Sequence, residues 1–217
     1  MDLDPARLSQ ADRYKLLIGG IVPRPIAWVS TVSPAGAPNL APFSFFAGAG
    51  SEPMSLLFCP ANRDDGEPKD TLRNLLPEIP GLPGAGDPPR EFVVNTVPFA
   101  LRREMSACAE PLPYGQSEFV AAGLTPEPSV KVRPPRVAGS PLAFECVVHQ
   151  IIRLAPGAPG GANVVIGRVV HVHAQDGLID HRRRLDAALL DSIGRMGGNA
   201  YCTTRDRFEI ERGLGAL

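Results

Sequence analysis

The chain has 217 residues, of which 44% are hydrophobic and 21% charged, the composition of a globular protein that is long enough to bury a sizeable core. Its 22 basic and 23 acidic side chains nearly cancel, which argues against a protein that binds nucleic acid as a bulk polyanion. No apolar run is long enough to cross a bilayer, and the acidic, polar start lacks the features of a secretory signal. We therefore expect one domain with no nucleic-acid or membrane partner.

The four cysteines are widely spaced and form no C-x-x-C pair, so zinc fingers and thioredoxin-type redox chemistry are not indicated. They are Cys59, Cys108, Cys146 and Cys202. A chain of this size needs no disulfide framework, and reduced thiols predict a cytoplasmic location.

Along the first third of the chain, the sequence predicts a short helix near 8–17 and then a hairpin. Residues 26–31 alternate sides as strand residues do, 33–38 carry the proline and glycine of a tight turn, and 39–46 return as an extended segment. The glycine-rich stretch 47–53 is predicted to be a break rather than a strand.

The next segment alternates short elements with loops. An apolar strand is predicted over 54–59, and a helix over 71–76 is expected to be capped by Asp70 or Thr71. Residues 77–90 hold five prolines and three glycines and are interpreted as an exposed loop insertion that is dispensable for folding.

The rest of the chain is dominated by strand patterns. A strand is predicted over 91–97, a long hairpin over 142–154 and 163–174, and short helices elsewhere. The predicted short helices cover 99–108, 116–122 and 184–193. Because strands and helices do not alternate regularly, a closed or partly open antiparallel barrel with peripheral helices fits better than a doubly wound sheet.

Several segments together resemble one known family. RPIAWVST at 24–31 followed by NLAPFSFF at 39–46 closely resembles the flavin reductase-like, FMN-binding split-barrel family, in its flavoredoxin-like branch. The similarity continues in KDTLRN at 69–74, EFVVN at 91–95 and AGLTP at 122–126. It implies a mainly β fold, an antiparallel split β-barrel of Greek-key type, as a single domain over 1–217 from which the insertion at 77–90 departs.

The best candidate anion site is Arg63 together with Lys69, Asp70 and Thr71, at the start of a predicted helix whose first N–H groups lack internal partners. From the residues alone, a solvated charged loop with Asp70 as a simple cap is the favoured interpretation, because exposed ion pairs are commonplace. The resemblance implies that this segment binds the phosphate of FMN.

The aromatic and hydroxyl side chains of 28–31 and 39–46 suit a flat, anionic ligand, although an ordinary core hairpin would carry a similar pattern. The resemblance implies that the flavin ring lies along this hairpin. Asn95 either lines the site or is structural, and Arg195 either contacts flavin, a subunit interface or solvent. The candidate cofactor-binding residues are Trp28, Ser30, Thr31, Asn39, Ala41, Pro42, Ser44, Phe45, Arg63, Lys69, Asp70, Thr71, Asn95 and Arg195.

No catalytic side chain or metal site is predicted. His171 and His173 share one face of a strand, but a catalytic zinc normally takes three protein ligands. No nucleophile elbow, Walker loop or dinucleotide-binding glycine motif is present.

The resemblance implies an FMN-dependent oxidoreductase, an NAD(P)H-dependent flavin reductase that passes hydride from nicotinamide to flavin. An FMN-binding electron carrier without nicotinamide turnover, or a barrel that has lost its cofactor, are the alternatives. A homodimer is expected, and a partner oxygenase would be a possible recipient of reduced flavin.

Overall fold

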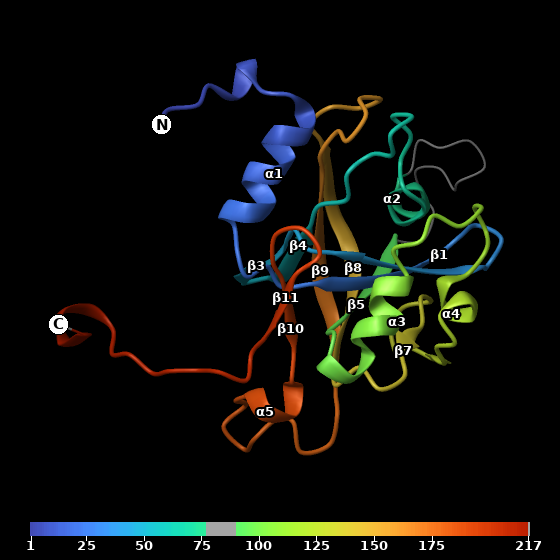
Figure 1. The fold of residues 1–217 in the computed structure, drawn as a ribbon. Helices are drawn as coiled ribbons and strands as arrows, with labels where there is room; N and C mark the ends of the chain where they lie inside the picture. Colours follow the sequence, from blue (N-terminus) through green and yellow to red (C-terminus); the bar gives the residue numbers. More distant parts are fainter. Residues whose placement is uncertain (77–89, 217) are drawn as a thin grey trace.

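The computed structural model describes residues 1–76 and 90–216, and its main element is one antiparallel sheet of seven strands (Figure 1). In spatial order the strands are β2 (Pro38–Phe43), β1 (Ala27–Val32), β5 (Glu91–Asn95), β8 (Leu142–Arg153), β9 (Asn163–Ala174), β4 (Met54–Phe58) and β3 (Phe46–Ser51). Because β2 and β3 remain separate edges, the strongly curved sheet is not closed. The predicted fold class, a split β-barrel with short peripheral helices, is confirmed.

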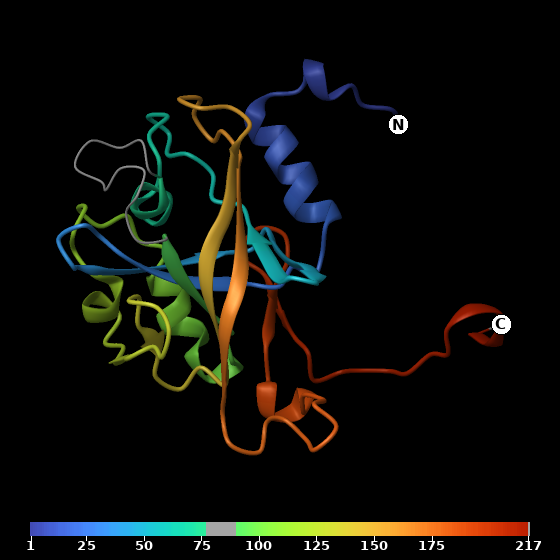
Figure 2. The same cartoon turned by 180° about the vertical axis from the view of Figure 1, so that it is seen from behind.

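Short elements surround this sheet (Figures 1 and 2). The helices are η1 (Pro5–Arg7), α1 (Gln10–Gly20), α2 (Asp70–Leu75), η2 (Phe99–Leu101), α3 (Arg102–Ala107), α4 (Glu118–Ala121), α5 (Ala187–Leu190) and η3 (Gly213–Ala216). Two small ladders pair β6 (Pro126–Glu127) with β7 (Arg136–Val137), and β10 (Ile193–Arg195) with β11 (Tyr201–Thr203). Within the two described ranges, no helix has the length and apolar character needed to span a membrane.

Strand β1 separates two hydrophobic cores, because its alternate side chains point to opposite faces of the sheet. Ala27 and Val29 pack in a cluster with Phe58 and the α2 residue Leu72. Trp28 points the other way, into a second cluster that includes residues of α3 and α4. The hairpin that carries the family motif is therefore buried on both faces.

Two of the predicted elements were wrong. Residues 47–53 are not a break: most of them belong to β3, which pairs with β4 across a register shift between Gly48 and Gly50. The strand exists because β4 supplies a partner, whereas glycine content alone indicates a loop. The predicted helix over 184–193 shrinks to α5, since Asp191 adopts a left-handed φ of 41° and the chain then enters β10.

The other predicted elements are confirmed within a few residues: the 33–38 turn, both long hairpin strands, and the helical segments near 10–20, 70–75 and 99–107. The predicted cap of α2 was wrong, because Lys69 occupies the N-cap position and its side chain makes no capping hydrogen bond. The insertion at 77–90 lies outside the described residues except for its last residue, Arg90.

Candidate functional site

Helix α2 is fastened to the β1–β2 hairpin by two hydrogen bonds between amide and hydroxyl side chains. The Asn39 Nδ2 donates to Thr71 Oγ1, and the Asn74 Nδ2 donates to Thr31 Oγ1, each over 2.9 Å. The hydroxyl of Tyr114 then donates to Asn74 Oδ1, also over 2.9 Å. This clasp brings three of the predicted site residues, Thr31, Asn39 and Thr71, into one buried cluster.

The start of α2 presents unpaired donors. Among the described residues, no acceptor receives the backbone N–H groups of Asp70, Thr71 or Leu72, and no side chain caps the helix. Thr71 and Leu72 are buried residues, 1% and 0% exposed. Buried N–H groups normally have a partner, so an acceptor from outside the chain, either water or an anion, is needed here.

The charges around this helix start favour an anion. Arg63 Nη2 lies 2.6 Å from Asp70 Oδ1, so the Asp70 carboxylate orients the guanidinium. No carboxylate in the described part of the chain lies within salt-bridge distance of Lys69. Burial, together with the nearby charge of Arg63, lowers the pKa of Lys69. An anion placed between these cations would offset both effects.

A shallow surface crevice, too narrow to enclose a water molecule, lies beside the clasp. Its lining residues are Ser33, Ala37, Pro38, Asn39, Asp70, Asn74, Tyr114, Gly115 and Gln116. The charged end of α2 and the turn of the β1–β2 hairpin therefore share one depression.

Three predicted site residues lie apart from this cluster and have structural contacts of their own. The Trp28 side chain is fully buried in the second core. The Ser30 hydroxyl donates to the carbonyl of Pro135 over 2.5 Å. Both polar atoms of the Asn95 side-chain amide form hydrogen bonds: Nδ2 donates to the Trp28 carbonyl and Oδ1 accepts from the Val137 N–H, each over 3.0 Å. Flavin contacts by these three side chains remain predictions.

The outer edge of β2 offers no free N–H group along most of its length. The Leu40 N–H points away from β1 and donates to Glu118 Oε2 over 2.8 Å. Pro38 and Pro42, which share the orientation of Leu40, have no N–H at all. Two prolines are tolerated because β2 is an edge strand, and they prevent another strand from pairing there. Predicted ligand contacts at Ala41 and Pro42 are therefore limited to side-chain packing and carbonyl groups.

Free backbone donors return just beyond β2. In the described residues, no hydrogen-bond acceptor faces the N–H of Ser44 or of Phe45. By strand rise, Ser44 is roughly 17 Å along the chain from Asn39. The hairpin thus separates two sets of open donors, one at the start of α2 and one at Ser44 and Phe45.

Arg24 was not predicted as a site residue, yet its side chain contacts both Ser44 and Phe45, at the end of the β1–β2 hairpin that lies away from the turn. Its guanidinium, in a residue 3% exposed, donates to Ser44 Oγ over 3.3 Å and lies 5.9 Å from the Phe45 ring centre. It also donates to the carbonyls of Ile21 and Met196, over 2.8 and 2.9 Å, and to that of Ile18. Burial lowers the pKa of this arginine. Arg24 begins the family-like motif at 24–31, but its partners come from the end of α1 and from the turn after β10, which the motif does not indicate.

Arg195 contacts Arg24 through its backbone rather than through its side chain. Its N–H and carbonyl exchange hydrogen bonds of 2.8 and 2.9 Å with Arg24. Its side chain instead folds over its own hairpin, donating to the Gly198 carbonyl over 2.6 Å and to the Tyr201 hydroxyl. The guanidinium lies 4.4 Å from the Tyr201 ring centre.

Within the described ranges, no group of three or more His, Cys, Asp or Glu side chains could hold a metal ion. Burial raises the pKa of Cys108 to about 12 and also raises that of Cys146, so both stay protonated thiols at neutral pH. The site is thus composed of hydrogen-bond donors and cations rather than of nucleophiles.

Comparisons with known proteins agree with this arrangement. The family described as "Flavin reductase like domain" matches residues 19–189. An uncharacterized protein of Deinococcus radiodurans is 38% identical over 216 residues, covering 96% of this chain and 88% of the relative. One from Halalkalibacterium halodurans is 38% identical over 215 residues, covering 98% of this chain and 96% of the relative.

Solved structures of similar fold carry oxidoreductase names. Nitrilotriacetate monooxygenase component B from Bacillus cereus superposes with a TM-score of 0.85 at 32% identity, covering 97% of this chain and 98% of that one. Pseudomonas fluorescens 2-nitrobenzoate 2-nitroreductase gives 0.83 at 28% identity, covering 99% and 97%. Flavoredoxin of Desulfovibrio vulgaris gives 0.71 at 17% identity over 99% and 100%, a likeness of fold alone. The chain therefore belongs to the flavin reductase-like domain family.

Proposed function

We propose that the protein is an FMN-dependent oxidoreductase, an NAD(P)H-dependent flavin reductase that transfers hydride from nicotinamide to flavin. The family, together with the names of two similar structures from Bacillus cereus and Pseudomonas fluorescens, supports the reaction class. One observation carries the choice of FMN: the open start of α2 beside Lys69 and Arg63, which suits a terminal phosphate.

The residues present fit an FMN molecule lying along the β1–β2 hairpin. Arg63, Lys69 and the N–H groups of residues 70–72 would hold its phosphate, with Thr71 fixed by Asn39. Asp70 would orient Arg63 rather than contact the anion. When bound, the flavin supplies the hydride and electron chemistry at its ring.

At the other end of the hairpin, the chain would hold the ring and tune it. The free N–H groups of Ser44 and Phe45 can donate to ring oxygen or nitrogen atoms, and donors aimed at developing negative charge favour reduction. The buried cation of Arg24 lies next to both residues and adds a positive field. No side-chain acid or nucleophile is required for this role.

Titration of the purified protein with FMN, FAD and riboflavin tests the phosphate assignment. We expect FMN to bind several-fold to a hundred-fold more tightly than riboflavin, at about 1.4 kcal/mol per tenfold. Lys69→Ala should remove most of this preference while leaving riboflavin affinity unchanged. Lys131→Ala, which changes an exposed lysine on another loop, is the matched control. Equal affinities for FMN and riboflavin in the unmodified protein would refute the assignment.

An electron-carrier flavoprotein is the second candidate, since open donors at a flavin ring would serve it equally well. Stopped-flow mixing of the FMN-loaded protein with NADH and with NADPH separates the two. A flavin reductase bleaches the flavin absorbance at a rate that saturates with nicotinamide concentration. Bleaching by dithionite but by neither nicotinamide would favour the carrier.

Three further expectations accompany this proposal. A monooxygenase is proposed as the recipient of reduced flavin, because the Bacillus cereus structure is named as a component of such a system. A homodimer is proposed from the family resemblance and from exposed apolar side chains on α1. A cytoplasmic location is proposed from the reduced state of all four cysteines.

A further inference from the structure

The helix α1 has little cover in a single copy of the chain. It has 11 residues, none of them buried, and its start is capped by the Ser9 hydroxyl, which accepts from the Asp12 N–H. Isolated helices shorter than about 12–15 residues are marginal in water, so α1 needs packing to be stable. Tyr14 and Leu17 lie on one side of α1 by helical spacing, and Ile21 follows as its C-cap residue; the three are 51%, 49% and 54% exposed. We call these three residues the α1 stripe.

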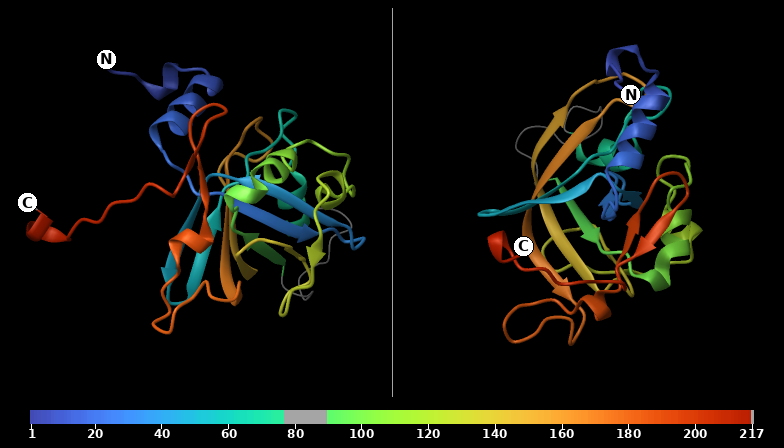
Figure 3. Two further views of the ribbon diagram at one scale, coloured as in Figure 1. Left: turned by 60° about the horizontal axis from the view of Figure 1, so that its bottom comes forward. Right: turned by 60° about the vertical axis from the view of Figure 1, so that its left-hand side comes forward.

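A second uncovered apolar feature is the C-terminal arm, residues 208–216. Phe208, Ile210 and Leu214 are 88%, 70% and 86% exposed, among the highest values for large apolar side chains in the described chain. Within that part of the chain, the arm makes no hydrogen bond, ion pair or ring contact with the body. Figures 1 and 3 show it running away from the sheet, on the same side of the molecule as α1.

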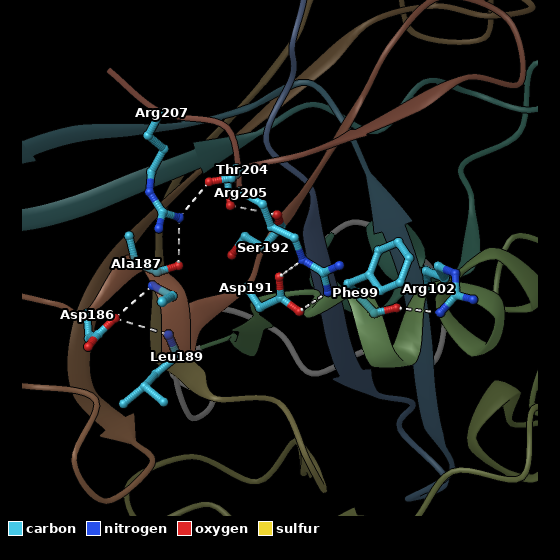
Figure 4. A network of polar contacts seen from close by, with 11 residues as sticks. Phe99, Arg102, Asp186, Ala187, Leu189, Asp191, Ser192, Thr204, Arg205 and Arg207 are labelled. Atoms are coloured by element: carbon cyan, nitrogen blue, oxygen red, sulfur yellow. Dashed lines mark hydrogen bonds and ion pairs between the residues drawn. The ribbon is translucent and has the colours of Figure 1, made fainter. Parts of the chain in front are cut away.

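The root of the arm is firmly held, which sets the direction in which it leaves the body (Figure 4). Arg205 makes two bonds of 2.8 Å to the Asp191 carboxylate, and its guanidinium lies 4.4 Å from the Phe99 ring centre. Arg207 donates to the Thr204 carbonyl over 2.6 Å, and the Thr204 hydroxyl donates to the Ser192 carbonyl over 2.9 Å. The arm leaves the α1 stripe of its own chain exposed, and because its root is held it loses less freedom on binding a partner than a loose tail would.

We propose that the C-terminal arm of one protomer packs on the α1 stripe of a second copy of this chain. Both surfaces are apolar and both lack cover in one copy, and a two-fold exchange would cover both at once. Their charges are complementary, since Arg13 and Lys15 outnumber Asp12 within α1, while Glu209 and Glu211 outnumber Arg212 on the arm. The inference concerns assembly and does not depend on the flavin chemistry.

Sedimentation equilibrium of the full chain tests the exchange. The triple variant Phe208→Ser/Ile210→Ser/Leu214→Ser and the single variant Leu17→Ser should each raise the dimer dissociation constant at least ten-fold. Val120→Ser removes an apolar side chain that is 83% exposed on α4, and it should leave the constant within about two-fold. A monomeric unmodified protein, or a dimer unaffected by the arm and stripe variants, would overturn the proposal.

Disulfide trapping identifies the occupant of the stripe. A Leu17→Cys chain and a Phe208→Cys chain with different affinity tags are mixed and oxidised, with the unmodified protein as the control for Cys59 and Cys202. We expect a reducible product of dimer mass that carries both tags. Failure to form this product would contradict the exchange. A single chain that carries both Leu17→Cys and Phe208→Cys is the second test. If its disulfide closes within a monomer, the arm folds back onto its own helix and the exchange is contradicted.

Discussion

At the scale of single residues, the buried polar groups explain how the site is held. Glu118, 6% exposed, accepts the only N–H that the outer edge of β2 presents between its two prolines. Burial raises the pKa of Glu118, against the lowering effect of the Leu40 N–H. The carboxylate thus joins α4 to the β1–β2 hairpin at an electrostatic cost.

The raised pKa predicts a pH-dependent stability for this contact. Between the unfolded and folded pKa values the folded state binds more protons, so the contribution of Glu118 is full below about pH 4 and is lost as pH rises through the folded value. Glu118→Gln keeps an acceptor and does not titrate. Its stability relative to the unmodified protein, from urea midpoints, should therefore improve as pH increases.

A difference that stays constant with pH would contradict this account of Glu118. Glu118→Ala is the matched comparison, because it removes the acceptor and leaves the Leu40 N–H unpaired. It should be less stable than Glu118→Gln by about 1–3 kcal/mol at every pH, because neither variant titrates at this position.

At the scale of elements, the position of α2 is fixed by its contacts with the β1–β2 hairpin rather than by the stability of so short a helix. Six residues make a weak helix, but the side chains of Asn39 and Asn74 fix it to the hairpin, and Leu72 and Leu75 pack in the first core. The charged helix start is thereby placed at the turn end of β1–β2, where a phosphate is proposed to bind.

Breaking this clasp should affect both stability and phosphate binding. Asn74→Ala leaves the buried Thr31 hydroxyl and the Tyr114 hydroxyl without their partner, at a cost of about 1–3 kcal/mol in urea unfolding. FMN affinity should fall by more than riboflavin affinity, because the displaced helix start is the proposed binding site of the phosphate. Tyr114→Phe should show a smaller effect, and Asn199→Ala, at an exposed turn, none. An unchanged ratio of FMN to riboflavin affinity would show that the clasp does not position the helix start.

At the scale of the whole molecule, the sheet and its two cores place three distant segments around one hairpin. Strand β1 pairs with β2 and β5, α2 packs on one face, and α3 and α4 pack on the other. The β10–β11 hairpin meets Arg24 at the far end. A site assembled in this way needs the complete barrel, which is why its parts are scattered from Arg24 to Tyr201.

The sequence by itself determined the fold class and most strands, because alternation, prolines and turn glycines act locally. It identified the β1–β2 hairpin and the charged segment at 63–71 for the same reason. Which side chains come together depended on the tertiary structure. Alternation along β1 predicts that Trp28 and Thr31 point to opposite faces of the sheet, but only the packing shows that α2 lies on the Thr31 face. The tertiary structure also decided the β3 strand, the role of Arg24 and the exposed arm, since each depends on contacts between segments far apart in the chain.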